Sequence, residues 1–405
     1  MKMTSRHILV LVAMCGLIAS GIGLVTNVSG LFFTPVADEF GILKGSASLM
    51  LTICNISLAI GGTILPRILN EKTLKPLLIG STGILAASTA ALAMCPSIMP
   101  MYVLCVLRGL AAGMVTFVFV TTVLNKWFVA SIGLATSIAM GCSGLAGALF
   151  SPIVNGIISS AGWRMGFVVL GLLTVVLNLP AIFFLPSLDP VTSGNRALGA
   201  DSAPAATSTN TANEQYVPPI NAAVFAAVVG FALFGSAITA LPQHFPGISE
   251  LYLRDAAVGA SMLSVCMIAN TAGKIVLGAL IDRLGTKVSV LLYTVLVAVG
   301  LGVVLMMRTP MLLLIAAALI GLCYSIATVG ITMITRDAFG LANYGTTYPI
   351  VNLVGSMSNA VFSSVVGFMY DFTGGYTLTL FVFLAMVASI FAIVLFVYGH
   401  TPEKA

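Results

Sequence analysis

Two positively charged residues stand inside apolar stretches of this 405-residue chain. Lys274 lies in the apolar stretch 256–281, eight residues before Asp282, and Arg108 lies at a similar depth in the stretch 98–124. At 1.5 Å of rise per helical residue, each side chain would sit roughly 12 Å inside a membrane-spanning helix. A cation at that depth costs about 2.5–3.5 kcal/mol, and it persists only beside a partner, water or a cavity. Both residues therefore need a specific explanation.

No acidic residue is placed to neutralise these cations. Each of the twelve Asp and Glu residues maps to a loop, a terminus or a membrane boundary. The charges must then be satisfied by a hydrated cavity, by helix-end carbonyls or by an anionic substrate, and the anion explains why two of them are present. Two simpler interpretations remain open. Lys274 could snorkel to the membrane boundary, and Arg108 could have a structural role, donating hydrogen bonds to neighbouring backbone carbonyls.

Polar, uncharged residues in the same stretches are candidate partners of a carboxylate. The tyrosine hydroxyls of Tyr324 and Tyr348 could donate to it, although a packing or interface role fits tyrosine nearly as well. Among the intramembrane asparagines, Asn27 and Asn352 are the first candidates, although an asparagine in a membrane helix more often forms a helix–helix hydrogen bond than it binds a ligand. The sequence predicts substrate contacts from these four residues.

Catalytic and metal chemistry are not indicated. The seven cysteines lie in or beside apolar stretches, with no C-x-x-C spacing and no histidine spacing suited to a metal, so they are predicted to be core residues. The spans contain no paired carboxylates that could act as acid and base. We therefore predict no cofactor, no metal and no enzymatic activity.

The elements that position these residues are transmembrane helices. The chain is 59% hydrophobic and only 7% charged, and twelve apolar segments are each long enough to cross about 30 Å of hydrocarbon as a helix. Eleven basic loop residues fall on one side against four on the other, which places both termini in the cytoplasm and the chain in the inner (cytoplasmic) membrane. The basic residues form no stripe of the kind that nucleic acids require. The lipid bilayer is the expected partner, and we expect a functional monomer.

The chain is predicted to be an all-α membrane protein of two pseudo-symmetric six-helix bundles. Residues 1–186 form the first bundle and residues 219–405 the second, joined by a cytoplasmic linker at 187–218 that is rich in Ser, Thr, Ala, Asn and Pro and is expected to be flexible. Three short sequence matches recur in order at offsets of about 212 to 216 residues, which indicates an internal duplication.

One loop carries a longer pattern. Gly278, Asp282, Arg283, Gly285 and Lys287 follow an apolar helix with the spacing G-x-x-x-D-R-x-G-x-K, which resembles the cytoplasmic loop signature of the major facilitator superfamily. The resemblance implies that Gly278 permits close helix approach, while Asp282, Arg283 and Lys287 form a charge latch that favours one conformer. A solvated turn is the alternative.

Scattered matches resemble the oxalate:formate antiporter and monocarboxylate porter branch of that superfamily. The matches are Pro35-Val36, Lys126-Trp127-Phe128, Gly162-Trp163-Arg164, Gly273-Lys274, Asp337-Ala338-Phe339-Gly340 and Asn343-Tyr344-Gly345. Lys274 occupies the position where this branch places a substrate-binding arginine, whereas the lysine of its oxalate carrier is Val351 here. Arg108, followed by Gly113, instead resembles the R-x-x-x-x-G of proton-coupled facilitators.

The resemblance also implies a substrate cavity. Tyr324 and Tyr348 match aromatic positions of the branch's cavity, while two of its other tyrosines align with Asn27 and Ser143, which implies a less aromatic cage. The expected function is secondary active transport of a small mono- or dicarboxylate by alternating access, through anion exchange or facilitated diffusion, with the carboxylate held between the two halves. The alternatives are a proton-coupled monocarboxylate symporter and an exporter of neutral or cationic molecules.

Overall fold

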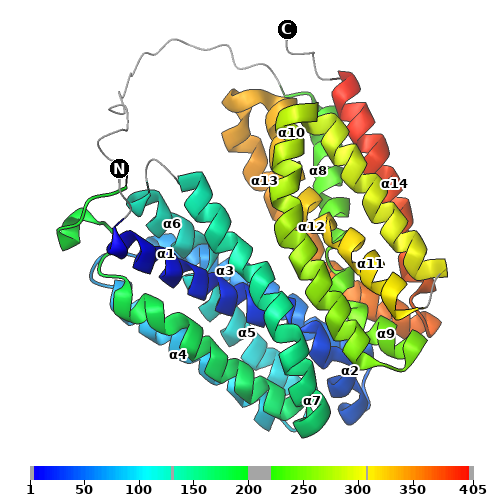
Figure 1. Ribbon diagram of the computed structural model, residues 1–405, viewed down its shortest axis with the longest axis horizontal. Helices are drawn as coiled ribbons and strands as arrows, with labels where there is room; N and C mark the ends of the chain where they lie inside the picture. The colour runs from blue at the N-terminus through cyan, green and yellow to red at the C-terminus, as the bar shows by residue number, and fades with distance from the viewer. Residues whose placement is uncertain (1–3, 129–131, 199–219, 307–308, 401–405) are drawn as a thin grey trace. The chain divides into compact units, whose positions relative to one another are not determined.

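The computed structural model describes residues 4–128, 132–198, 220–306 and 309–400, and helices account for nearly all of them (Figure 1). No β-strand is present in these ranges. Arg308, Lys404 and linker residues 199–218 lie outside the described residues. The helices are α1 (Ser5–Ile18), α2 (Gly30–Phe40), α3 (Lys44–Ile68), α4 (Leu74–Ala91), α5 (Ile98–Val115), α6 (Phe117–Trp127), α7 (Ile132–Phe184), α8 (Ala222–Ile238), α9 (Phe245–Leu253), α10 (Ala256–Met306), α11 (Pro310–Gly321), α12 (Cys323–Ser325), α13 (Ile331–Thr373) and α14 (Thr377–His400).

Ten of the described helical segments are long and apolar enough to cross a membrane. Two of them, Leu134–Phe184 and Ala256–Met306, are 51 residues long, which is about 75 Å of helix and more than twice the hydrocarbon thickness. Each is interrupted by a glycine, so each provides two crossings. The prediction of an all-α fold with twelve membrane-spanning helices is therefore confirmed.

Glycine makes these interruptions possible. Gly162 has φ 82° and ψ 162° inside α7, and Gly285 has φ 79° and ψ 162° inside α10. Gly340 repeats this conformation inside α13, with φ 65° and ψ 173°. This region of backbone space is accessible essentially only to glycine. Three connections between consecutive helices thus depend on a residue without a Cβ.

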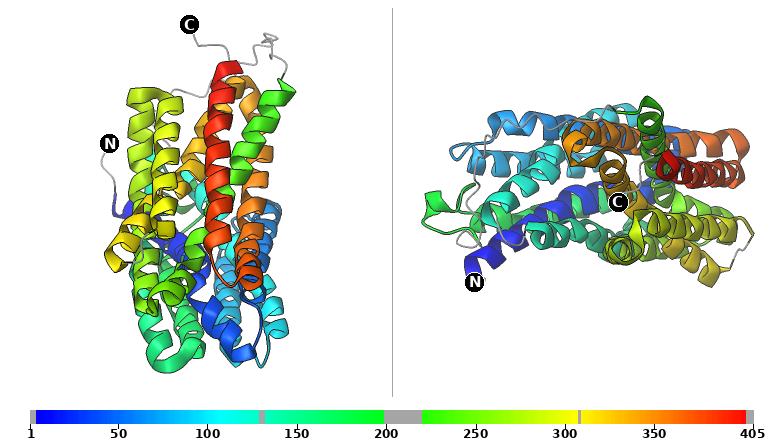
Figure 2. Two further views of the ribbon diagram at one scale, coloured as in Figure 1. Left: turned by 90° about the vertical axis from the view of Figure 1, so that its right-hand side faces the viewer. Right: turned by 90° about the horizontal axis from the view of Figure 1, so that it is seen from above.

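Contacts divide the chain into two compact units that do not follow the sequence boundary. Unit 1 comprises Met1–Ser29 and Ile53–Asn213, and unit 2 comprises Gly30–Thr52 and Glu214–Ala405. Helix α3 is shared, because its first residues pack in unit 2 and the remainder in unit 1. The division into sequence halves at 187–218 stays a prediction. Within unit 2, α10 lies beside α11 and α14, and α8 lies beside α14 (Figure 2).

Unit 1 is held together by close helix contacts that fix the position of α5. A Cβ on Gly109 would lie 2.2 Å from the carbonyl oxygen of Cys54, and one on Gly113 would lie 2.1 Å from that of Leu58. The backbones of α3 and α5 therefore touch where no side chain intervenes, as small residues allow in membrane proteins. This contact sets the position of Arg108, the neighbour of Gly109.

The first part of the linker is bound to unit 1. The Glu71 carboxylate accepts hydrogen bonds from the backbone N–H groups of Leu188 and Asp189, at 2.9 and 2.8 Å. The Trp127 indole donates to the Ser187 carbonyl at 3.3 Å, and the His7 Nε2 group donates to the Arg196 carbonyl at 3.0 Å. The sequence predicts a flexible segment, but its first residues have fixed partners because specific side chains satisfy their backbone groups.

Unit 2 binds the segment Gly30–Thr52 through α13. The Asp371 carboxylate accepts hydrogen bonds from the N–H groups of Lys44 and Gly45, at 3.0 and 2.7 Å, and so caps the N-terminus of α3. Further along, the Thr52 hydroxyl donates to the Ala360 carbonyl at 2.6 Å and lies 2.6 Å from the Ser364 hydroxyl. A segment from the first half of the sequence is thus hydrogen-bonded to a helix from the second half.

Candidate functional site

Lys274 lies on the buried face of α10 without a partner. Its helical neighbours Met267, Asn270, Gly273 and Leu277 are buried, while Lys274 itself is half-buried. Its ammonium makes no hydrogen bond and no ion pair with any residue that the structure describes. The predicted cation is therefore on the inner side of its helix and has no ion-pair partner among the described residues of unit 2.

The turn that carries Lys274 is fixed by its neighbours. A Cβ on Gly273 would lie 2.9 Å from both Leu322 Cδ2 and Ser325 Oγ, so the backbone of α10 packs directly on the segment that follows α11. The Tyr293 hydroxyl donates to the Gly273 carbonyl at 2.9 Å, a bond within α10 across its glycine turn. The backbone of this turn is therefore held from two sides.

The two predicted tyrosines of unit 2 have structural contacts. The Tyr324 hydroxyl donates to the Thr239 carbonyl at 3.1 Å. Tyr348 stacks on Tyr344 with ring centroids 4.9 Å apart and planes at 16°, and its hydroxyl lies 3.4 Å from that of Thr332. A role in binding substrate stays a prediction for both residues, and Tyr324 would have to exchange its present acceptor to fulfil it.

The remaining predicted residue of unit 2 is Asn352 on α13. It is exposed, and its side-chain amide makes no hydrogen bond with the described residues. Asn359, two turns further along, is instead tied to the fold, because its amide nitrogen donates to the Thr239 hydroxyl at 2.7 Å. A contact of Asn352 with substrate stays a prediction.

Arg108 in unit 1 is 4% exposed and incompletely satisfied. One terminal nitrogen donates to the Leu24 carbonyl at 3.5 Å, the long end of the hydrogen-bonding range, and Nε has no acceptor among the described residues. Leu24 belongs to a π-helical turn, Ala19–Asn27, and such turns alter the regular backbone pairing and are frequent at functional sites. The carbonyl contact agrees with the structural interpretation, but five donors cannot be satisfied by it alone.

Asn27 is the predicted site residue with the firmest structural role. Its amide nitrogen donates to the Ser143 carbonyl at 2.9 Å, joining the π-helical turn to α7. Asn27 and Arg108 belong to unit 1, whereas Lys274, Tyr324, Tyr348 and Asn352 belong to unit 2. A contact of Asn27 with substrate stays a prediction.

The four predicted gating residues do not form a latch in this conformation. Asp282, Arg283 and Lys287 are exposed, and none makes an ion pair or a hydrogen bond with the described residues. A Cβ on Gly278 would meet no atom within 4 Å, so close helix approach does not occur there. The indispensable glycine of the motif is Gly285, because it makes the turn. A gating role in another conformer stays a prediction.

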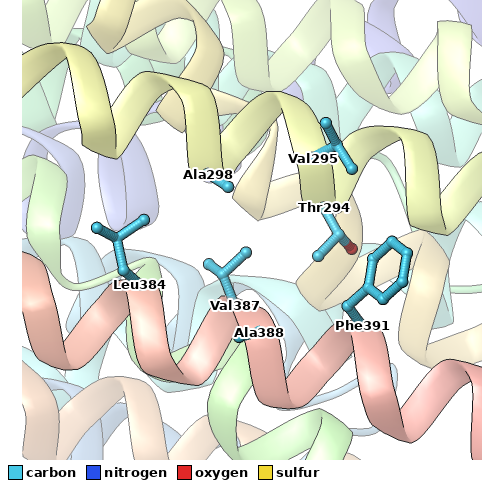
Figure 3. Close-up of a pocket in the computed structure, with 7 residues that line it drawn as sticks. All are labelled: Thr294, Val295, Ala298, Leu384, Val387, Ala388 and Phe391. Atoms are coloured by element: carbon cyan, nitrogen blue, oxygen red, sulfur yellow. The ribbon is translucent and has the colours of Figure 1, made fainter.

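A pocket in unit 2 does not resemble an anion site. It has a volume of about 350 Å³ and lies where α10 faces α14, lined mainly by apolar side chains (Figure 3). The lining residues are Thr294, Val295, Ala298, Leu384, Val387, Ala388 and Phe391. The one hydroxyl in this lining, that of Thr294, donates to the Val290 carbonyl at 2.8 Å. The pocket offers no charge and no free donor to a carboxylate.

Two buried polar side chains of unit 2 lie near Gly273: Asn270 is three residues before it on α10, and Ser325 Oγ lies 2.9 Å from the position of a Cβ on Gly273. Asn270 Oδ1 and Ser325 Oγ have no hydrogen-bond partner among the described residues. The sequence identifies Asn270 only as one of several intramembrane asparagines, and it gives no signal for Ser325, since serine in a membrane helix usually donates to its own backbone.

Comparison with known proteins identifies a family for nearly all of the chain. The sequence profile of the Major Facilitator Superfamily matches residues 11–254 and 222–405. No curated protein sequence matches the chain.

Three solved transporter structures share the fold. A bacterial homologue of the human lysosomal transporter Spinster, inward-facing and occupied, has a TM-score of 0.69 at 13% identity, covering 98% of this chain and 96% of that one. A D-xylose–proton symporter has a TM-score of 0.70 at 13% identity, covering 98% of both chains. A nucleoside transporter has a TM-score of 0.70 at 12% identity, covering 96% of this chain and 99% of the other. At such identities, the likeness concerns the fold alone.

Proposed function

Because the chain belongs to the Major Facilitator Superfamily and is a multi-pass membrane transporter that works by alternating access, we propose that its substrate is a small organic anion, a mono- or dicarboxylate. The observation that carries this proposal is the pair of inward-placed cations, Lys274 and Arg108, neither of which has an acidic partner among the described residues. Oxalate:formate exchangers and monocarboxylate porters are the branch whose chemistry this fits.

Each of the two cations lacks the partner that an intramembrane charge normally has. An intramembrane cation normally pairs with an acid or with backbone carbonyls. Arg108 has one long hydrogen bond to a carbonyl, and Lys274 has none in the described part of the chain. A carboxylate would supply charge-assisted hydrogen bonds to both kinds of donor, and these are about twice as strong as neutral ones. The substrate is therefore the missing counterion.

Anion exchange or facilitated diffusion is the proposed mode. Proton symport requires a group that takes up and releases protons in the membrane, and the histidine available, His244, is buried with its Nε2 donating to the Ser363 carbonyl at 2.9 Å. That bond fixes the tautomer and makes the imidazole part of the fold. Proton-coupled monocarboxylate symport is the second candidate, with the Lys274 ammonium as the proton carrier that the described spans offer.

Export of a neutral or cationic molecule is the third candidate. It predicts a substrate without negative charge, in contrast to the two carboxylate candidates. Two of the transporters that share the fold are a D-xylose–proton symporter and a nucleoside transporter, and neither name includes a carboxylate. Intramembrane acids would favour a cationic substrate, and the charges placed inside the described spans are positive.

We also propose that the chain is a monomer in the inner membrane with both termini in the cytoplasm, as its loop charges favour.

The test is counterflow into proteoliposomes preloaded with single carboxylates, including formate, oxalate, lactate and larger aliphatic and aromatic acids. We expect uptake of a labelled carboxylate to be driven by some members of this panel and by no sugar or nucleoside. Lys274→Gln is expected to abolish that uptake while Lys126→Gln, on the exposed end of α6, preserves it. Unchanged carboxylate uptake by folded Lys274→Gln would remove the proposed site.

A further inference from the structure

The apolar pocket between α10 and α14 opens away from the core of unit 2. Its lining includes Val295, which belongs to an exposed apolar stripe on α10 together with Val288, Leu292 and Val299, each 42–51% exposed. Ala388 on the α14 wall is exposed as well. An exposed apolar stripe on a membrane-spanning helix faces the lipid. The pocket is therefore a groove that a lipid molecule can enter.

Water does not fill such a groove. An apolar cavity of ~150 Å³ stays dry and takes up an apolar ligand, and this groove has a volume of about 350 Å³. It runs along both helices, since Thr294 lies toward Phe391 at one end and Ala298 lies toward Leu384 at the other (Figure 3). An elongated apolar space that is parallel to membrane-spanning helices suits an acyl chain.

The Thr294 end of the groove points to a polar contact between the same two helices. Thr286 lies eight residues before Thr294, and Tyr398 lies seven residues after Phe391. The Tyr398 hydroxyl is hydrogen-bonded to the Thr286 side chain and donates to Asp337 Oδ2 at 2.8 Å. At 1.5 Å of rise per residue, this contact lies about 10–12 Å beyond the groove. It is at the end of the spans that the loop charges predict to be cytoplasmic.

Lys287 follows Thr286 and carries an unpaired charge. It is exposed, and its ammonium makes no ion pair or hydrogen bond with the residues that the structure describes. Thr294 lies seven residues further along, almost two full turns, so Lys287 and the groove share one face of α10. Side chains lean toward the N-terminus of their helix, which directs the ammonium away from the groove and toward the membrane boundary. The acid nearest in sequence, Asp282, precedes the turn at Gly285.

The spacing between this charge and the groove matches one leaflet of a bilayer. Ala298, at the far end of the groove, is eleven residues from Lys287, which is roughly 16 Å along the helix. Half of the hydrocarbon core of a bilayer is about 15 Å thick. A phospholipid whose phosphate lies at Lys287 therefore reaches the whole groove with one acyl chain.

We propose that Lys287 and the groove between α10 and α14 form a binding site for an anionic phospholipid, with the phosphate at the Lys287 ammonium and one acyl chain in the groove. Basic residues at the cytoplasmic end of membrane helices attract anionic headgroups. A phosphate also gives the ammonium charge-assisted hydrogen bonds. Because the loop motif forms no latch in this conformation, Lys287 is available to the lipid. The inference does not depend on the carboxylate proposed as substrate.

The experiment uses photoactivatable lipids in proteoliposomes that contain the full chain. Phosphatidylglycerol and phosphatidylcholine probes carry the same diazirine-bearing acyl chain, and labelled peptides are quantified by mass spectrometry relative to the total labelling of the chain. We expect phosphatidylglycerol to label residues 288–299 and 384–395 about fivefold more than phosphatidylcholine does. This factor corresponds to about 1 kcal/mol, the contribution of one basic residue at a membrane surface.

Three variants, each checked for folding by gel filtration, separate the charge from the groove. Lys287→Gln is expected to lower labelling by phosphatidylglycerol to the level of phosphatidylcholine. Lys126→Gln is the matched control, because it removes another exposed lysine, at the end of α6, and it is expected to keep the preference. Ala298→Phe fills the groove and is expected to reduce labelling of these residues by both probes.

Salt tests the unsubstituted protein in case Lys287→Gln does not fold. Raising the ionic strength from about 0.1 M to 1 M shortens the Debye length from about 10 Å to 3 Å, and is expected to remove most of the preference for phosphatidylglycerol. Equal labelling by the two probes, or a preference that persists in Lys287→Gln or at high salt, would overturn the inference. An equal loss in Lys126→Gln, or undiminished labelling in Ala298→Phe, would overturn it as well.

Discussion

Replacing Asp371 by Asn tests whether its carboxylate holds the segment Gly30–Thr52 in unit 2. The carboxylate accepts hydrogen bonds from the N–H groups of Lys44 and Gly45 at the first turn of α3. Hydrogen bonds to a charged group contribute about 1.5–3 kcal/mol each, against about 0.5–1.5 kcal/mol for neutral ones. The negative charge also interacts favourably with the helix N-terminus.

The size of the effect follows from what asparagine retains. Its amide offers a single neutral oxygen, so one hydrogen bond and the charge are lost. Asp371 is half-buried, and solvent screening reduces the loss of local stability to about 2 kcal/mol. Such a loss raises the rate of hydrogen exchange at the first turn of α3 about 30-fold, if exchange occurs by local opening.

Hydrogen–deuterium exchange of the peptide that contains residues 44–52 measures this directly. Asp255→Asn is the matched control, because Asp255 accepts from the N–H groups of Ala257 and Val258 at the start of α10. It is expected to leave residues 44–52 unchanged and to affect exchange at the start of α10 less, because both of its hydrogen bonds use one oxygen, which asparagine keeps. Equal exchange of residues 44–52 in Asp371→Asn and the unsubstituted protein would refute the assignment of Asp371 as the residue that anchors α3.

Three further predictions concern other parts of the fold. Arg108→Gln is expected to raise the KM for a carboxylate about tenfold or more at normal yield if the arginine binds substrate, whereas a purely structural arginine would reduce the yield of folded protein first. Glu71→Gln is expected to speed amide hydrogen exchange in residues 187–198 about threefold to tenfold, because the Glu71 carboxylate accepts two backbone hydrogen bonds from this segment. An unchanged exchange rate would contradict the role of Glu71 in binding the segment. Gly285→Ala is expected to lower the stability of the folded protein by about 1–3 kcal/mol, measured as a lower apparent Tm, because φ is 79° at this residue. Gly302→Ala is the control, and it is expected to leave the stability unchanged or to raise it, because Gly302 is helical and a Cβ there meets open space. Equal changes in Tm for the two variants would argue against strain at Gly285.

The architecture could be predicted from the sequence because it follows from one-dimensional signals. Twenty apolar residues in lipid must form a helix to satisfy their own backbone groups, so segment length and composition determine the number of spans. The glycines that end such segments are also visible, and Gly162 and Gly285 do make the turns between helices. The sequence could not show that Gly30–Thr52 packs in unit 2, since that depends on contacts such as Asp371 with Gly45 that are more than 300 residues apart in the chain.

The surroundings of the candidate site were predicted less completely. The placement of Lys274 on the inner face of α10 follows from the sequence pattern. Whether a polar side chain is free depends on its neighbours in space, and Asn27 is bound to the Ser143 carbonyl whereas Asn270 Oδ1 has no partner in the described chain. Nothing in the composition of the two segments distinguishes these asparagines. The linker illustrates the same limit, because its polar composition predicts flexibility while Glu71 binds its first residues.

The central claim is that the transporter recognises the negative charge of its substrate through Lys274. The most direct measurement compares counterflow of a transported carboxylate with that of its uncharged amide, such as lactate and lactamide, which have nearly the same shape. We predict that the unsubstituted protein exchanges the carboxylate at least about 100-fold faster, because the Lys274 ammonium, which has no ion-pair partner among the described residues, can pair with the acid anion and not with the uncharged amide. Lys274→Gln should lose this preference. Equal transport of acid and amide by the unsubstituted protein, or an undiminished preference in Lys274→Gln, would contradict the account.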